Sequence, residues 1–182
     1  LFGQDGVDAN VAQGDPEAIT LFFLMNPMGD KITITMGGVQ SAQNAAVLET
    51  GGVGSCVVIV LYDKLNKIGG MAHAMLPALP AASADGNNPL KYVDCALQEL
   101  LRQLTALGAQ KDDLIAWLAG GAQMFSLYGN ADNSVGMQNV AAATEGLSDE
   151  GIRIKNEDTG GSVGRCVRFD LMSGVCEVTT KM

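Results

Sequence analysis

The residues best suited to chemistry lie in one stretch, 50–73, which reads TGGVGSCVVIVLYDKLNKIGGMAH. Cys56 follows a run of small residues and opens an apolar segment, and His73 is the only histidine of the chain. A thiol becomes a strong nucleophile when a neighbouring imidazole takes its proton and a thiolate–imidazolium pair forms. A cysteine enzyme built on this sequence would therefore use Cys56 as its nucleophile and His73 as its base.

Both residues also have ordinary structural explanations, which the sequence leaves open. A cysteine at the head of an apolar strand is commonly a small buried hydrophobe, and a lone histidine is commonly a core imidazole bonded to a backbone carbonyl. A catalytic base usually has a third group that orients it. Thr50 is the nearest candidate in the same segment, and Asp63 competes with it.

Residues 50–55 (TGGVGS) are too rich in glycine for a regular element and predict a tight turn in which backbone amides approach a ligand. Gly54 and Ser55 lie directly before the thiol. The amide of Cys56 and a second donor from this turn would then hold an oxyanion. We therefore expect Gly54 and Ser55 to form the substrate or oxyanion loop.

The elements on either side must bring the cysteine and the histidine together. Residues 56–62 (CVVIVLY) are continuously apolar and predict a strand buried on both faces, 63–70 a hairpin loop and 71–76 the returning strand. Cys56 and His73 are 17 positions apart, since 73 − 56 = 17. A hairpin centred near Leu65 would place them opposite each other or within one or two residues of that register.

The rest of the chain alternates strand and helix patterns without a strict βαβ rhythm, which indicates mixed sheets with helices outside. The predicted elements are a strand at 32–36, an irregular connection or short strand at 40–49, a long lid-like loop at 77–89, a helix at 91–107 stopped by Gly108, a strand at 114–118, a glycine turn at 119–125, a helix at 135–147, a strand at 152–158 and a hairpin of 165–170 with 175–180.

Length and charge restrict the class of protein. A chain of 182 residues with 47% hydrophobic residues fits one domain, which we place at 32–182, after an N-terminal arm (1–31) of unknown role whose apolar residues 21–24 would dock on the domain. The net charge of −9 argues against nucleic acid and anionic lipid as partners. The longest apolar run, 18–28, is too short to span a membrane.

The four cysteines predict neither a disulfide framework nor a metal centre. Cys95, Cys166 and Cys176 lie in predicted helix and hairpin segments where core packing is the default, and no CxxC or histidine-linked spacing occurs. The sequence also has no phosphate-binding loop of the GxxxxGK[ST] type. We expect a reduced cytoplasmic protein without metal or cofactor.

Several blocks, taken in order, resemble one family. They are GSCVVIVLYD, GGMAHAMLP, KYVDCAL, AGGAQMF, VGMQNV, EDTGGSVGRCVRFD and SGVCEV, and they cover about 32–180. Together they resemble the chemoreceptor glutamine deamidase family, CheD. The resemblance implies that Cys56 is the nucleophile, His73 the base and Thr50 the residue that orients the base.

The resemblance also implies the activity, the partners and the fold. The expected activity is that of a protein-glutamine glutaminase, a cysteine-dependent amidohydrolase, which converts glutamine side chains on the cytoplasmic helices of methyl-accepting chemotaxis receptors to glutamate. The expected second partner is a CheC-type phosphatase. The implied fold is α+β, with two mixed sheets packed as a sandwich and helices on the outer faces (α/β/β/α), similar to deamidating toxin cysteine hydrolases.

Two other functions remain open at this point. The first is a regulatory binding module that docks a CheC-type phosphatase, with catalysis idle or secondary. The second is a cysteine hydrolase for small amides, which would need a closed pocket instead of an open groove. An intact Thr50, Cys56 and His73 favours the enzyme, since a scaffold needs no thiol and imidazole in register.

Overall fold

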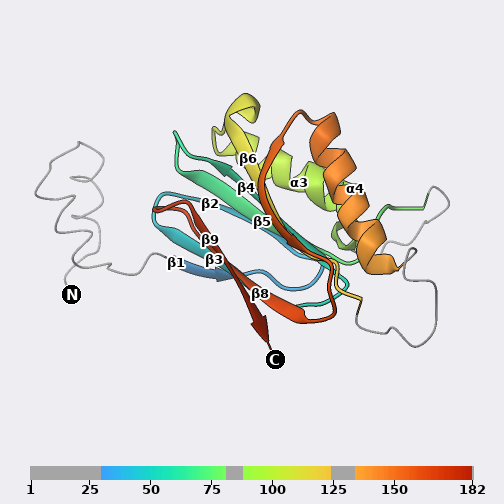
Figure 1. The fold of residues 1–182 in the computed structure, drawn as a ribbon. Helices are drawn as coiled ribbons and strands as arrows, with labels where there is room; N and C mark the ends of the chain where they lie inside the picture. The colour runs from blue at the N-terminus through green and yellow to red at the C-terminus, as the bar shows by residue number, and fades with distance from the viewer. Residues whose placement is uncertain (1–29, 81–87, 124–133, 182) are drawn as a thin grey trace, which may run out of the picture. The chain divides into compact units, whose positions relative to one another are not determined.

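The computed structural model describes residues 30–80, 88–123 and 134–181, whose strands form two sheets packed face to face (Figure 1). The four-stranded sheet has the order β1 (Asp30–Thr33), β3 (Ala46–Val53), β8 (Gly164–Asp170) and β9 (Val175–Lys181). The five-stranded sheet has the order β2 (Val39–Gln43), β5 (Ile68–Ala74), β4 (Val57–Asp63), β6 (Leu114–Gly120) and β7 (Arg153–Thr159).

The hairpin of β4 and β5 lies in the middle of the five-stranded sheet. All residues of both strands are buried, as the continuous apolar pattern predicted. The register pairs Val58 with His73, and it extends to Asp63 opposite Ile68. The connecting loop is therefore shorter than the predicted 63–70, because pairing with β4 includes the glycines of β5.

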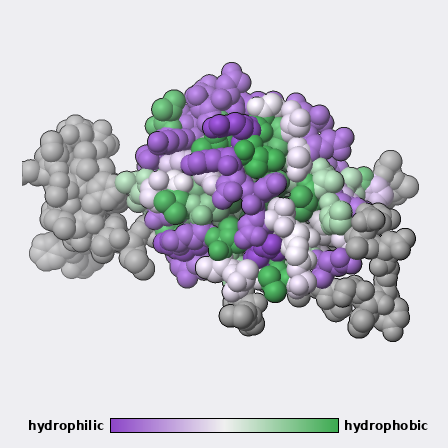
Figure 2. All heavy atoms as spheres, viewed as in Figure 1, coloured by the Kyte–Doolittle hydropathy of each residue, from purple (hydrophilic) through white to green (hydrophobic). Residues whose placement is uncertain are grey.

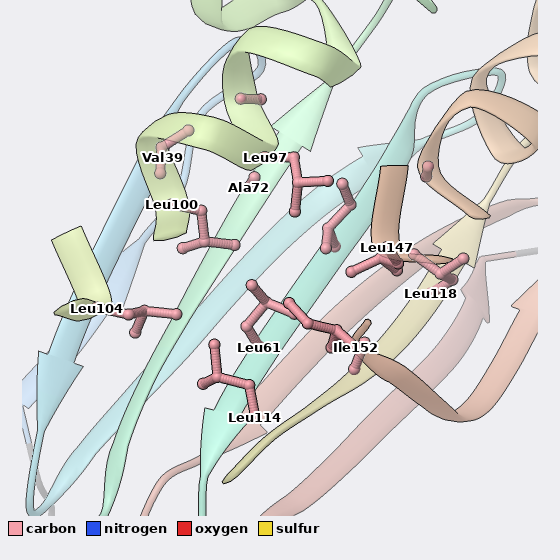
Figure 3. Close-up of a cluster of buried hydrophobic side chains, with 14 of the residues drawn as sticks. Val39, Leu61, Ala72, Leu97, Leu100, Leu104, Leu114, Leu118, Leu147 and Ile152 are labelled. Carbon is pink, nitrogen blue, oxygen red and sulfur yellow. The ribbon is translucent and has the colours of Figure 1, made fainter. Parts of the chain in front are cut away.

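Two α-helices of the described chain, α3 (Val93–Ala106) and α4 (Val135–Asp149), cover the outer face of the five-stranded sheet (Figure 1). The helix α3 buries Val93, Ala96, Leu97, Leu100 and Leu104 at helical spacing. Gly108 follows its C-cap residue, Leu107, with a φ of 99°, a conformation that favours glycine and ends the helix where predicted. Figure 3 shows leucines of α3 pointing toward Leu61 of β4.

The helix α4 connects β6 to β7, which pair in parallel. Parallel neighbours need a crossover connection, and a helix is the usual one. The buried stripe of α4 consists of Gly136, Asn139, Ala143 and Leu147. The single polar residue of this stripe is Asn139.

A second apolar layer fills the space between the two sheets. Its aromatic centre joins Tyr62 and Trp117 of one sheet to Phe169 of the other, with ring centroids of Tyr62 and Phe169 5.1 Å apart in an edge-to-face arrangement. The Tyr62 hydroxyl donates to the Leu171 carbonyl at 2.5 Å. These contacts tie the sheets together and fix their relative position.

The structure revises two sequence predictions near the start of the domain. Residues 40–49, for which an irregular connection or a short strand was expected, are mostly strand and contain most of β2 and the first part of β3. The predicted turn at 50–55 is instead largely strand: β3 runs to Val53 and accommodates the glycines in a bulge between Thr50 and Val53. The predicted lid at 77–89 falls partly outside the described residues, as do the predicted arm at 1–31 (all but its last two residues) and its apolar patch.

The α+β sandwich expected from the sequence is confirmed, with its described helices on the outer face of the five-stranded sheet. On the face shown in Figure 2, hydrophobic residues are interspersed with hydrophilic ones. Within the described ranges, no helix is both long enough and apolar enough to cross a membrane.

Candidate active site

Thr50, Cys56 and His73 lie between the two sheets, at one end of the β4–β5 hairpin. His73 is opposite Val58 in the register, and Cys56 lies two residues before Val58, in the same inter-sheet layer. Such diagonal neighbours on one face are within reach of each other's side chains. Thr50 comes from β3, in the other sheet, and its hydroxyl lies 2.8 Å from Nδ1 of His73. The structure therefore joins Thr50 to His73 by a hydrogen bond and places Cys56 at a diagonal position in the same layer.

The hydrogen bonds of Thr50 assign the tautomer of His73. The Thr50 hydroxyl donates its one proton to the carbonyl oxygen of Ile34, at 2.7 Å. It must therefore accept from Nδ1–H of the ring, and in the neutral imidazole Nε2 is then the acceptor. Nε2 is buried and has no hydrogen-bond partner among the described residues. In this tautomer Nε2 is the ring nitrogen that can accept a proton.

Burial favours the neutral form of both partners. It raises the pKa of the Cys56 thiol and lowers the pKa of His73. The amide of Cys56 hydrogen-bonds its own sulfur, which partly opposes the rise in the thiol pKa. These shifts favour the uncharged thiol and the uncharged imidazole over a thiolate–imidazolium ion pair.

The loop before the nucleophile is held by three successive carbonyls. The Gly54 carbonyl accepts from the Ala122 amide at 2.8 Å, and the Cys56 carbonyl accepts from the Gly121 amide at 2.7 Å. Between them, the Ser55 carbonyl accepts from the side chain of Asn139 at 2.8 Å. The predicted oxyanion-loop residues, Gly54 and Ser55, are thus fixed on their carbonyl side.

The glycine turn after β6 makes this close approach possible. Gly120 has a φ of 115°, and a Cβ atom there would collide with the carbonyl oxygen of Cys56. A side chain at this position would therefore displace the nucleophile. The sequence predicted a glycine turn at 119–125 in which the backbone closely approaches another group. For Gly120 and Gly121 that group is the carbonyl of Cys56.

Comparison with known proteins identifies the family of the chain. The family model CheD, described as "CheD chemotactic sensory transduction", matches residues 75–180, more than half of the chain. The chain belongs to the CheD family. The matched segment begins two residues after His73 and includes Asn139.

Relatives in the CheD family cover most of the chain. A "Probable chemoreceptor glutamine deamidase CheD" of Methanococcus maripaludis is 45% identical over 143 residues, which span 79% of this chain and 90% of that protein. Proteins with the same name from Thermococcus kodakarensis (41% identical, 79% and 89%) and Desulfitobacterium hafniense (40% identical, 84% and 95%) are similar.

Asp63 does not orient His73, so the competing prediction for the third residue is wrong. It lies at the opposite end of β4, at the hairpin. Its carboxylate accepts from the amides of Leu65, Asn66 and Gln110 and from the Asn66 side chain, at 2.7 to 3.2 Å. Asp63 therefore closes the hairpin at the end of β4 that lies away from His73.

Asn139 is the residue of the site that the sequence analysis missed. It is fully buried, and its Nδ2 donates to the Ser55 carbonyl at 2.8 Å and to the Met75 carbonyl at 2.9 Å. The signal was present in the helical spacing, since Asn139 is three residues after Gly136 and four before Ala143 on the buried stripe. A polar residue there needs a reason.

Proposed function

We propose that this CheD-family chain is a protein-glutamine deamidase that converts glutamine side chains of chemoreceptors to glutamate. The observation that carries the proposal is the hydrogen-bond relay from His73 Nδ1 through Thr50 to the Ile34 carbonyl. This relay leaves Nε2 as a free acceptor on the face that carries the Cys56 thiol. The names of the relatives support the same substrate class.

The first half of the reaction forms a thioester. His73 Nε2 takes the thiol proton as the Cys56 sulfur attacks the carboxamide carbon of the glutamine, so that charge separates only as the S–C bond forms. The amide of Cys56 stabilises the oxyanion, and the amide of Ser55 is the second donor we assign from the loop. The C–N bond then breaks, and His73 returns its proton to the nitrogen, which leaves as ammonia.

The second half hydrolyses the thioester. With ammonia gone, His73 is neutral again and takes a proton from a water molecule that attacks the thioester carbon. The S–C bond breaks, the sulfur regains a proton from His73, and the carboxyl group of glutamate leaves. One water is consumed and one ammonia released for each glutamine.

The proposed compartment is the cytoplasm, where the cytoplasmic helices of the receptors would be the substrate. All four cysteines of the chain are free thiols in the structure, a state that a reducing compartment maintains. A CheC-type phosphatase is the proposed second partner. It rests on the family resemblance alone.

Mass spectrometry of a chemoreceptor cytoplasmic fragment tests the proposal. Incubation with the protein should add roughly one dalton for each deamidated glutamine, and Cys56→Ala should add nothing. The matched control is Cys95→Ala, which removes a partly buried thiol from α3 and should retain full activity. A Cys56→Ala variant with normal turnover would refute the thiol mechanism. No shift with any variant, together with retained binding of a CheC-type phosphatase, would favour the binding module.

A further inference from the structure

Asn139 makes two hydrogen bonds that join the ends of two strands. One proton of its Nδ2 goes to the carbonyl of Ser55, directly before the nucleophile, and the other goes to the carbonyl of Met75, two residues after the base. The strand β4 begins at Val57 and β5 ends at Ala74, so both contacts lie just beyond the last paired residues. The side chain continues the connection between the strands where the ladder stops.

The orientation of this carboxamide follows from its neighbours. Both are carbonyl oxygens, which accept only, so the NH₂ group must face them. The oxygen Oδ1 is then buried without a hydrogen-bond partner among the described residues. An unpaired buried acceptor destabilises a fold, so apolar packing does not explain the choice of asparagine.

The bond to Ser55 acts on the amide of Cys56. The carbonyl of Ser55 and the N–H of Cys56 belong to one planar peptide unit, and no peptide bond in the described chain is cis. In a trans unit the C=O and N–H point in opposite directions. Holding the Ser55 carbonyl against α4 therefore aims the Cys56 amide away from α4.

The neighbouring peptide is fixed in the same way. The Ala122 amide holds the Gly54 carbonyl, which shares a peptide unit with the N–H of Ser55. Here the donor is backbone, which no side-chain substitution removes. Asn139 is the side chain that fixes the Cys56 amide from outside.

We propose that Asn139 is a positioning residue that aims the Cys56 amide at the developing oxyanion and holds the strand ends carrying Cys56 and His73 together. This inference rests on the proposed deamidase function for its catalytic consequence. The interaction matters most in the transition state, when negative charge is on the substrate oxygen. Loss of Asn139 should therefore lower kcat and leave KM nearly unchanged.

The test compares Asn139→Ala and Asn139→Asp with the wild-type protein. Aspartate has the shape of asparagine but, when ionised, donates no hydrogen bond, so a steric role would tolerate it and a donor role would not. The two hydrogen bonds of Asn139 to the Ser55 and Met75 carbonyls are called the clamp below. The matched control is Leu147→Ala, which destabilises the packing of α4 two turns further along and leaves the clamp intact. Three readouts are measured well below each variant's unfolding transition: kcat and KM on receptor fragment, alkylation of Cys56 by iodoacetamide, and hydrogen exchange of 54–57 and 74–76.

Alkylation separates alignment from general damage, because iodoacetamide reacts by direct displacement and forms no oxyanion. Both Asn139 variants should lose about 100-fold in kcat, with KM and the alkylation rate changed by no more than about 3-fold. Exchange of both segments should accelerate in the Asn139 variants and not in Leu147→Ala. The control should keep its kcat within about 2-fold of wild type.

Three results would overturn the inference. The first is wild-type hydrogen exchange of both segments in Asn139→Ala, which would show that no clamp exists whether or not the chain deamidates anything. The second is a parallel loss of deamidation and alkylation, and the third is full activity of Asn139→Asp. A wild-type protein that deamidates no receptor glutamine refutes the proposed function instead, and accelerated exchange would then still support the clamp.

Discussion

The two ends of the β4–β5 hairpin differ in whether their buried polar atoms have hydrogen-bond partners. At the hairpin turn, Asp63 is buried and its carboxylate receives four hydrogen bonds. At the other end, Nε2 of His73 and Oδ1 of Asn139 are buried and have no partner in the described chain. Both ends belong to the same pair of strands, so the difference lies in what each end is built to do.

The pKa shifts follow the same division. Burial opposes ionisation of Asp63, but the hydrogen bonds from Asn66 and the surrounding amides outweigh it, and the pKa of the carboxyl is lowered. At the site, burial dominates, so the pKa of Cys56 is raised and that of His73 lowered. A charge that is fully bonded stabilises a fold, whereas a neutral pair with a free lone pair is ready to react.

The largest effect on activity should come from removing the proposed base. His73→Ala should lower kcat/KM on receptor fragment by about 1,000-fold or more at neutral pH, because no other histidine is present to take the thiol proton. Peptide mass spectrometry of the substrate measures the rate. The control is Met71→Ala, a fully buried residue of the same strand, which should lose stability and keep its kinetics. Equal losses in both variants would contradict the assignment.

Removal of the Asp63 carboxylate, which accepts four hydrogen bonds, should lower stability and leave the reaction unaffected. Asp63→Ala leaves the part-buried donors of Leu65, Asn66 and Gln110 without their acceptor, so we expect the free energy of unfolding to fall by about 2 kcal/mol. Urea denaturation followed by tryptophan fluorescence measures it. At a temperature where the variant is folded, its kcat should equal that of the wild-type protein; a large loss of kcat would mean that the two ends are coupled.

Thr50 should have a smaller effect than His73, because it orients the ring by a neutral hydrogen bond. Such a bond contributes about 1 kcal/mol, which corresponds to a loss of about 5-fold in kcat/KM for Thr50→Ala. Thr50→Ser keeps the hydroxyl and should retain most of the activity. A loss for Thr50→Ala as large as that for His73→Ala would show that the hydroxyl does more than orient.

The smallest expected effect is on pH dependence. His73 must be neutral to accept a proton, and burial places its pKa below the ordinary value of 6.5. The midpoint of the acid limb of activity, measured by kcat/KM from pH 5 to 8, should therefore lie below 6.5. An acid limb centred above 6.5 would contradict the neutral resting pair.

The same shift predicts a change in stability. The unfolded chain binds a proton on this histidine near pH 6.5, before the folded chain does, so unfolding becomes easier as pH falls from 6.5 toward the folded pKa. Urea midpoints of the wild-type protein should decrease in that window. His73→Ala should lack this component, and identical pH dependence of the two proteins would argue against it.

Local sequence patterns predicted most of the helices and strands, because these elements depend on residues that are close to one another in the chain. The apolar run of β4 and the leucine spacing of α3 each predict which of their residues are buried. The glycines after Thr50 misled the analysis, because a bulged strand and a turn need the same backbone freedom. Thr50 pairs with Val167, and the two residues are 167 − 50 = 117 positions apart in the sequence. No pattern near Thr50 predicts this pairing.

The site was predictable to the same extent. Cys56 and His73 are joined by one hairpin, so their proximity followed from counting residues. The choice between Thr50 and Asp63 depended on how the second sheet packs, which no short segment encodes. Asn139 was visible as an amide on a buried helical stripe, but its two carbonyl partners belong to residues 84 and 64 positions earlier.

The assembly of the site from two sheets has a consequence for the life of the chain. Thr50 reaches His73 only after β3 is held in its sheet, and β8, one of its two neighbours there, is made near the C-terminus. On a ribosome, the nucleophile and the base are synthesised early, yet the relay that orients them must wait for the last strands. We therefore expect a nascent chain to lack an oriented base until β8 has been synthesised, and a chain truncated before β8 to carry a cysteine and a histidine without deamidase activity.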